Sequence, residues 1–292
     1  MKPCLDCLPC LARNAIDLAR KSARGNDALE AEIARSGMEI LGNVAAEGYS
    51  QPPPCYARRL IDNALSKCGG AVPDPWAPEK KTSTELALKL MDRLSELPGW
   101  VAGDFESRLR LAVAGNILDF SIYADLDIAA AMEQMSTAFT KPVDKAAVAE
   151  LKRRMDEARS ILWIFDNCGE AVFDRLLMEP YRDKLTLAVR GKPAFNDMTR
   201  AELAESGYPD GFAAGGVVSN DDGVPGVVDA TCGEKFRKAF SAADLVVAKG
   251  QANFETMNER TDKQIAFLFL AKCPVVCRAV GAEPKMIQII FA

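Results

Sequence analysis

The chain contains no histidine among its 292 residues. This absence excludes Ser-His-Asp and Cys-His catalytic sites, zinc centres with histidine ligands, and an imidazole acting as general acid or base. Acid-base chemistry would have to come from carboxylates, lysine, tyrosine, cysteine or metal-bound water. A metal held by oxygen ligands fits this restriction best, because hard cations such as Mg²⁺ and Mn²⁺ prefer carboxylate, carbonyl and water.

The sequence also lacks a long apolar run, a positive net charge and glycine-rich nucleotide motifs. No run approaches the roughly 18 to 20 apolar residues of a membrane span, so we expect a cytoplasmic protein without membrane contact. The net charge of -5 argues against a broad nucleic-acid surface. Neither G-x-x-x-x-G-K-[ST] nor G-x-G-x-x-G after a strand occurs, which argues against P-loop and dinucleotide enzymes.

The chain has 9 cysteines. An odd number without an export signal favours free thiols or metal ligands over a disulfide framework. Cys4, Cys7 and Cys10 are spaced for thiolate ligation of zinc or an iron-sulfur cluster, with Cys55 or Cys68 as the plausible fourth ligand. Cysteines three apart also share one face of a helix, so a structural or redox role is the alternative.

Helical spacing of apolar residues dominates the first 127 residues. Helices are predicted near residues 11–23, 27–47, 55–67, 82–95 and 104–123. In the last of these, Asn116 and Asp119 lie three apart on a polar face of an otherwise apolar helix. We expect that face to form a pocket wall, with an ordinary solvated face as the alternative.

A different pattern begins at the apolar run 161–165, which is too short for a helix and reads as a buried parallel strand. The run ends at Asp166 and Asn167, and helical spacing resumes at residue 170. Ligands of open α/β sheets bind beyond the carboxyl ends of the strands, so a metal or phosphate is expected at this pair. The alternative is that one of the two residues merely caps the next helix.

The rest of the chain alternates strands with helices. Further strands are predicted at residues 185–189, 213–219, 243–248, 266–270, 274–280 and 286–291. Such alternation predicts an α/β fold with a mostly parallel sheet.

Polar side chains follow several of these strands. They are Asp166 and Asn167; Arg190, Asn196 and Asp197; Lys249, Gly250, Asn253 and Glu255; and Lys272. A solvated strand end would explain any one group. Together they describe metal-assisted phosphoryl chemistry, in which acids and amides hold the metal and Lys249 or Arg190 neutralises phosphate. Gly250 would let backbone N–H groups approach the same anion.

Short motifs occur in order along nearly the whole chain: Cys7-Leu8-Pro9-Cys10, Asp74-Pro75-Trp76, Ala114-Gly115-Asn116-Ile117-Leu118-Asp119-Phe120, Asp166-Asn167-Cys168-Gly169-Glu170, Lys192-Pro193 with Asn196-Asp197-Met198-Thr199, Lys249-Gly250-Gln251-Ala252-Asn253-Phe254-Glu255, and Lys272-Cys273-Pro274. Together they resemble the damage-control phosphatases, also called domain-of-unknown-function family 89. The paired cysteines are similar to its archaeal and bacterial branch. Ala252 departs from the usual glycine, and Met198 from the usual β-branched residue.

The resemblance implies a three-layer α/β/α domain with a mostly parallel sheet, residues 128–292, packed against a multihelical region, residues 1–127. It implies a divalent cation (manganese, magnesium, cobalt or nickel) held by Asp166, Asn167 and Asp197. It also implies hydrolysis of small phosphorylated metabolites, sugar phosphates among them.

Residue roles follow from that reading. The catalytic candidates are Asp166, Asn167, Asp197 and Lys249. The substrate-binding candidates are Asn116, Asp119, Arg190, Asn196, Gly250, Asn253 and Glu255. We expect the hard oxygen ligands and the soft thiols of the cysteine cluster to lie in different parts of the fold. Two other functions stay open, a carboxyl methyltransferase and a non-enzymatic metal or redox module centred on the cysteines.

Overall fold

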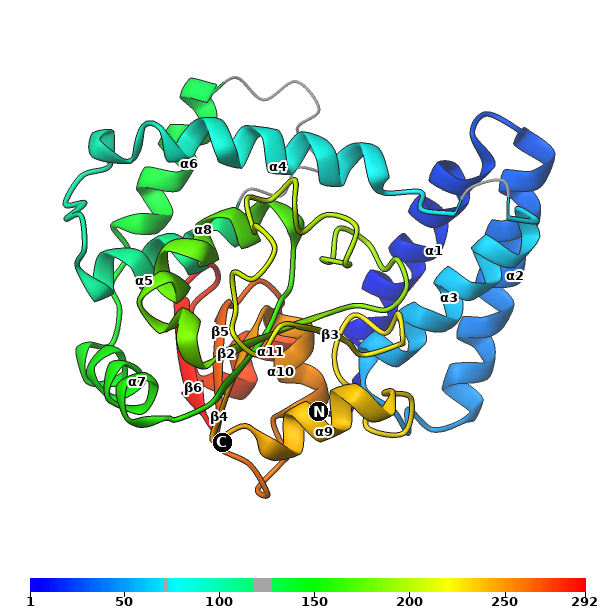
Figure 1. Ribbon diagram of the computed structural model, residues 1–292. Coiled ribbons are helices and arrows are strands. Elements are labelled where there is room, and N and C mark those ends of the chain that lie inside the picture. Colours follow the sequence, from blue (N-terminus) through cyan, green and yellow to red (C-terminus); the bar gives the residue numbers. More distant parts are fainter. Residues whose placement is uncertain (71–72, 118–127) are drawn as a thin grey trace.

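The computed structural model describes residues 1–70, 73–117 and 128–292. The chain enters the fold through helices, as the apolar spacing predicts (Figure 1). These are α1 (Cys7–Ala23), α2 (Asp27–Ala46), α3 (Pro53–Lys67), α4 (Ala77–Met91), the short 3₁₀ helix η1 (Leu94–Glu96), α5 (Phe105–Ala114), η2 (Gly115–Ile117), α6 (Ile128–Phe139) and α7 (Lys145–Glu157). No helix in this part of the chain, or in the other described residues, is long and apolar enough to cross a bilayer.

Strands and helices then alternate. They are β1 (Ile161–Ile164), α8 (Cys168–Met178), η3 (Glu179–Lys184), β2 (Leu185–Val189), β3 (Val217–Ser219), α9 (Glu234–Ala242), β4 (Leu245–Lys249), α10 (Gln251–Met257), β5 (Ile265–Leu270), α11 (Pro274–Val280) and β6 (Ile287–Phe291). The strand order is β3-β2-β1-β4-β5-β6. Among the strands of the described residues, only β6 runs antiparallel to its neighbour, so the predicted mostly parallel sheet is confirmed.

Residues 274–280 are a helix, and their prediction as a strand is wrong. The apolar run is short, and its ends decide the structure. Pro274 occupies the first helical turn, where its missing N–H is no loss, and Gly281 ends the helix with φ 65°. The helix then buries Val276 and Cys277 against the sheet.

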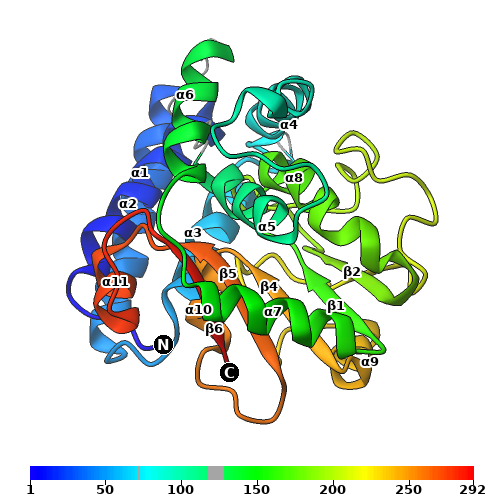
Figure 2. The same ribbon diagram turned by 90° about the vertical axis from the view of Figure 1, so that its left-hand side faces the viewer.

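Helices cover both faces of the sheet. One face packs against α5, α7 and α8, through side chains such as Leu109, Leu151 and Leu177. The opposite face packs against α9, α10 and α11, through side chains such as Phe236 and Phe254. The predicted three-layer α/β/α arrangement is therefore confirmed, and Figure 2 shows α7 crossing in front of the sheet.

The helical region has two parts. Helices α1, α2 and α3 pack on one another around Leu18, Ile33 and Leu60, and this core also takes in Ala194 from the segment after β2. Helices α4 and α6 pack instead with α5 and with Phe173 of α8. Helix α5 precedes residue 127 but belongs to the sheet core, and α6 follows residue 127 but belongs to the helical core. This packing does not separate two units at residue 127, so the domain boundary there stays a prediction.

Candidate active site

The site lies where the sheet changes direction. From β1 the chain builds outward to β2 and β3, whereas β4 lies on the other side of β1 and leads to β5 and β6. Asp166 and Asn167 follow β1, and Gly250 follows β4. Such a switch point opens a crevice at the carboxyl ends of the strands. Gly250 has φ 81°, and a Cβ there would overlap the Asp166 carboxyl group, so only glycine fits.

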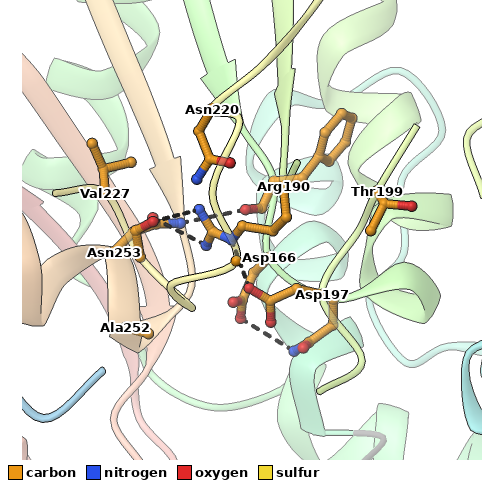
Figure 3. A network of polar contacts seen from close by, with 12 residues as sticks. Asp166, Arg190, Asp197, Thr199, Asn220, Val227, Ala252 and Asn253 are labelled. Carbon is orange, nitrogen blue, oxygen red and sulfur yellow. Dashed lines mark hydrogen bonds and ion pairs between the residues drawn. The ribbon is translucent and has the colours of Figure 1, made fainter. Parts of the chain in front are cut away.

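The loop after β2 brings Asp197 to the same place. The Cys168 N–H donates to Asn196 O at 3.0 Å, and the Met198 N–H donates to Asp166 O at 2.8 Å. Asn167 and Asp197 thereby form a two-residue β-bridge. The sequence predicted that these acids share one sheet edge, and the structure adds the backbone bonds that hold the loop against β1. Figure 3 shows Asp166 and Asp197 side by side.

Both carboxyl groups are buried. Burial raises the pKa of Asp197 to about 7, with Arg190 opposing the shift and Asp166 adding to it. Burial also raises the pKa of Asp166, against the effects of Arg190 and Lys272. Two carboxylates that repel each other in a dry site are electrostatically suited to a divalent cation.

The donor set fits a hard cation. Asn167 stands at the N-cap of α8, but its side chain makes no capping bond. Its Nδ2 donates instead to Asp166 Oδ2 at 3.1 Å, which leaves the amide oxygen as a further donor atom beside the two acids. Among the described residues, no three Cys, Asp or Glu side chains gather as a metal site, so a cation bound here would need this carboxamide as a ligand.

Asn116 supports the same cluster from η2. Its Nδ2 donates to Asp166 Oδ2 at 2.9 Å and to Glu170 Oε2 at 2.6 Å. Asn116, the described member of the expected polar face, therefore does turn toward Asp166. Asp119, its predicted companion, lies outside the described residues.

Lys249 lies beneath the site, with partners other than the expected phosphate. Its side chain is 0% exposed, forms an ion pair with Glu170, and donates to Asp174 Oδ1 at 2.7 Å and Ala112 O at 2.9 Å. Burial would lower the pKa of Lys249, but the two acids outweigh it and raise that pKa. These contacts assign Lys249 to holding α8 and α5 on β4.

Arg190 and Asn253 also hold neighbouring groups of the site in place. Arg190 donates to Asp197 Oδ2 at 2.7 Å, to Gly226 O at 2.9 Å and to Asn253 Oδ1 at 3.2 Å (Figure 3). The Asn253 amide donates to Lys249 O at 2.6 Å. Both side chains were predicted to bind substrate; in the structure these hydrogen bonds hold Asp197 and the end of β4, and a substrate contact stays a prediction.

A cavity of about 240 Å³ opens on Asp166 and Asn167. Its walls include the predicted residues Asn116, Asp166, Asn167, Asn196 and Glu255.

Lys272 also lines this cavity, and the list of site residues drawn from the sequence omits it. Its side chain is exposed, and its charge lowers the pKa of Asp166. The signal was present, because Lys272 closely follows β5 at the same sheet edge. The role of neutralising phosphate was assigned instead to Arg190 or to Lys249, which ends the neighbouring strand β4.

A second cavity, of about 280 Å³, adjoins the first and shares Asn167, Asn196 and Glu255 with it. Cys7 and Cys10 line it, together with Cys273 from the start of α11. The expectation that the cysteine cluster lies in a different part of the fold is therefore wrong. Helix α1 packs with α3 over the carboxyl end of the sheet, and this packing carries the motif to the site.

Comparisons with known proteins cover both the helical and the α/β parts. A family model described as the damage-control phosphatase ARMT1-like domain matches residues 4–286. A damage-control phosphatase from Pyrococcus horikoshii is 32% identical over 287 residues, covering 95% of this chain and 94% of that protein. Another, from Archaeoglobus fulgidus, is 30% identical over 247 residues, covering 82% of this chain and 83% of that protein.

The fold agrees with the sequence matches. The crystal structure of a domain-of-unknown-function 89 family protein from Pyrococcus horikoshii superposes with a TM-score of 0.85 at 28% identity, covering 99% of each chain. The resemblance found in the motifs is confirmed, and this chain belongs to the damage-control phosphatase family.

Proposed function

We propose that this protein is a metal-dependent phosphatase that hydrolyses small phosphate monoesters. The observation that carries the proposal is the cluster of Asp166, Asn167 and Asp197 at the switch point of the sheet, where Asp166 and Asn167 line a cavity that also presents Lys272. Membership of a phosphatase family supports the same reaction class. Sugar phosphates are the substrates that the family resemblance suggests.

The reaction replaces the bond from phosphorus to the ester oxygen with a bond from phosphorus to water. The proton that water loses ends on the released alcohol. A divalent cation held by Asp166, Asn167 and Asp197 would supply the positive charge that stabilises the phosphoryl group during this transfer. The chain itself contributes the fixed positions of these three donors, because Asn116, Arg190 and Gly250 leave them little freedom.

Two further side chains act within the cavity. The Lys272 ammonium group is exposed there and can pair with a phosphoryl oxygen as negative charge develops. Glu255 also lines the cavity, and burial raises its pKa to about 7. A carboxyl group with that pKa can accept and return a proton at neutral pH, which suits it to orient the attacking water.

The alternatives draw less support from the site. A carboxyl methyltransferase would need a binding loop for its nucleotide cofactor, and no glycine-rich loop of the kinds considered follows a strand. A non-enzymatic metal or redox module would centre on Cys4, Cys7 and Cys10. Those thiols do not gather as a metal site in the described structure.

The test is phosphate release from a panel of phosphate monoesters with EDTA and with added Mg²⁺, Mn²⁺, Co²⁺ or Ni²⁺. We expect chelation to abolish release and at least one of the cations to restore it. An Asp197→Asn variant should keep its fold and lose most of the restored activity. Release that is indifferent to EDTA would reject the proposed chemistry, and methyl transfer without release would favour the first alternative.

A further inference from the structure

The two adjoining cavities differ in chemistry. The cavity over Asp166 and Lys272 is lined mainly by carboxylate, amide and ammonium groups. The second cavity leads away from Asn167 and Asp197 toward the helical region, and most of its remaining wall is apolar. A ligand anchored at the metal cluster would therefore place the rest of its structure against that apolar wall.

The apolar wall comes from elements far apart in the sequence. Helix α1 contributes Leu11, α3 contributes Ala57, the loop after β2 contributes Phe195 and α11 contributes Val275. Phe195 is fixed there by an edge-to-face contact with Trp76, with ring centroids 5.4 Å apart. The wall is thus built from packed side chains and not from a single mobile loop.

The cysteine motif belongs to the same wall. Burial raises the pKa of the Cys7 thiol to about 11 and also raises the pKa of Cys10. Both thiols are therefore neutral near pH 7, and a neutral thiol behaves as a small apolar group. On this view the cysteines shape a pocket surface.

Several of the polar side chains on this cavity have partners within the protein. The Gln251 amide donates to Glu255 Oε1 at 2.7 Å, and its oxygen accepts from the Lys272 N–H at 3.1 Å. Asp6 is ion-paired with Arg278. Asn14 of α1 and Asn196 of the loop after β2 also line the cavity and can offer hydrogen bonds. A polyol placed here would lose water and gain few hydrogen bonds in return.

We propose that the substrates are phosphate monoesters of apolar alcohols, with an alkyl or aryl group that fills the cavity between Leu11, Phe195 and Val275. This inference rests on the proposed function, because it takes the phosphate to bind at the metal cluster. It narrows the substrate class away from the sugar phosphates that the family resemblance suggests. The cavity volume of about 280 Å³ accommodates a benzyl-sized group.

Binding of non-hydrolysable phosphonates tests this independently of turnover. Methylphosphonate, benzylphosphonate and 3,4-dihydroxybutylphosphonate would each be titrated by calorimetry into the full-length protein with Mg²⁺ present. We expect benzylphosphonate to bind at least tenfold more tightly than the other two, because its ring leaves water for an apolar wall. Its binding should also show the more negative heat-capacity change.

A matched pair of variants locates the effect. Val275→Asn places an amide in the wall, whereas Val101→Asn changes a valine that is 57% exposed and does not line this cavity. Val275→Asn should weaken benzylphosphonate binding at least threefold relative to methylphosphonate, and Val101→Asn should change neither. Equal affinity of wild type for the three ligands, preference for the dihydroxybutyl compound, or no binding of benzylphosphonate would overturn the inference. Loss of phosphate release alone would count only against the proposed catalysis.

Discussion

At the scale of single residues, two lysines near the site have opposite roles. Lys249 is enclosed by Glu170, Asp174 and a backbone carbonyl, whereas Lys272 is exposed in the cavity beside Asp166. Sequence position alone cannot separate them, because each stands at the end of a central parallel strand or just beyond one. The difference comes from α8, which supplies two acids on the side that Lys249 faces.

Replacing each lysine by methionine should separate stability from activity. Lys249→Met leaves two buried acids without their cation and should lower the free energy of unfolding by about 3 to 5 kcal/mol. Lys272→Met should leave that free energy within about 0.5 kcal/mol and reduce kcat/KM for a phosphate monoester about 100-fold. Denaturant unfolding and steady-state kinetics measure the two effects. Equal loss of activity per folded molecule in both variants would contradict this assignment.

Gly250 gives a second prediction at this scale. Gly250→Ala adds a methyl group that overlaps the Asp166 carboxyl group and forces alanine to φ 81°, so we expect Mn²⁺ affinity to fall at least tenfold. Gly281→Ala is the matched control, because φ there is 65° and nothing lies within 4 Å of the added Cβ. That variant should lose about 1 kcal/mol of stability and keep its Mn²⁺ affinity. Unchanged Mn²⁺ binding in Gly250→Ala, measured by calorimetry, would place the cation elsewhere.

At the scale of elements, α3 holds two loops of the α/β domain in place. Arg58 of α3 is largely buried and donates to Pro193 O at 3.1 Å and to Gly223 O at 3.2 Å. The loop after β2 carries Asp197 a few residues farther on. The helical region therefore does more than cover the sheet, because it fixes the loop that completes the proposed metal site.

Arg58→Met should loosen these loops. Loss of two charged hydrogen bonds, one of them buried, should lower the free energy of unfolding by about 2 to 4 kcal/mol. Hydrogen exchange should accelerate at Gly191 and Lys192, whose N–H groups donate to Asp222 O across the two loops. Arg59→Met is the control, since its partner Glu47 is a surface residue. Exchange that accelerates equally in both variants would show that Arg58 does not hold the loops.

At the scale of the whole molecule, much of the architecture could be predicted from the sequence. Short apolar runs that end in polar residues marked β1, β2 and β4, and their parallel pairing placed Asp166, Asp197 and Gly250 at one edge. Periodicity could not identify residues 274–280 as a helix, because caps and not apolar spacing decide so short a segment.

Other features could not be predicted from the sequence because they depend on long-range packing. The position of the cysteines depends on how α1 packs with α3 over the carboxyl end of the sheet, which no local pattern encodes. The occupation of Arg190 and Lys249 by buried partners likewise required the three-dimensional arrangement. The predicted residues Asn116, Asp166 and Asn167 therefore line one cavity, whereas the predicted cations Arg190 and Lys249 have buried partners.

The central claim is that Asp166, Asn167 and Asp197 hold a catalytic divalent cation, and anomalous diffraction from a crystal soaked with Mn²⁺ and benzylphosphonate tests it most directly. The account predicts a manganese peak roughly 2.2 Å from an oxygen of each of these three side chains, with a phosphonate oxygen on the same ion and Lys272 facing the phosphonate. A peak at the cysteine thiols, or no peak in crystals of protein that releases phosphate only with Mn²⁺, would contradict it.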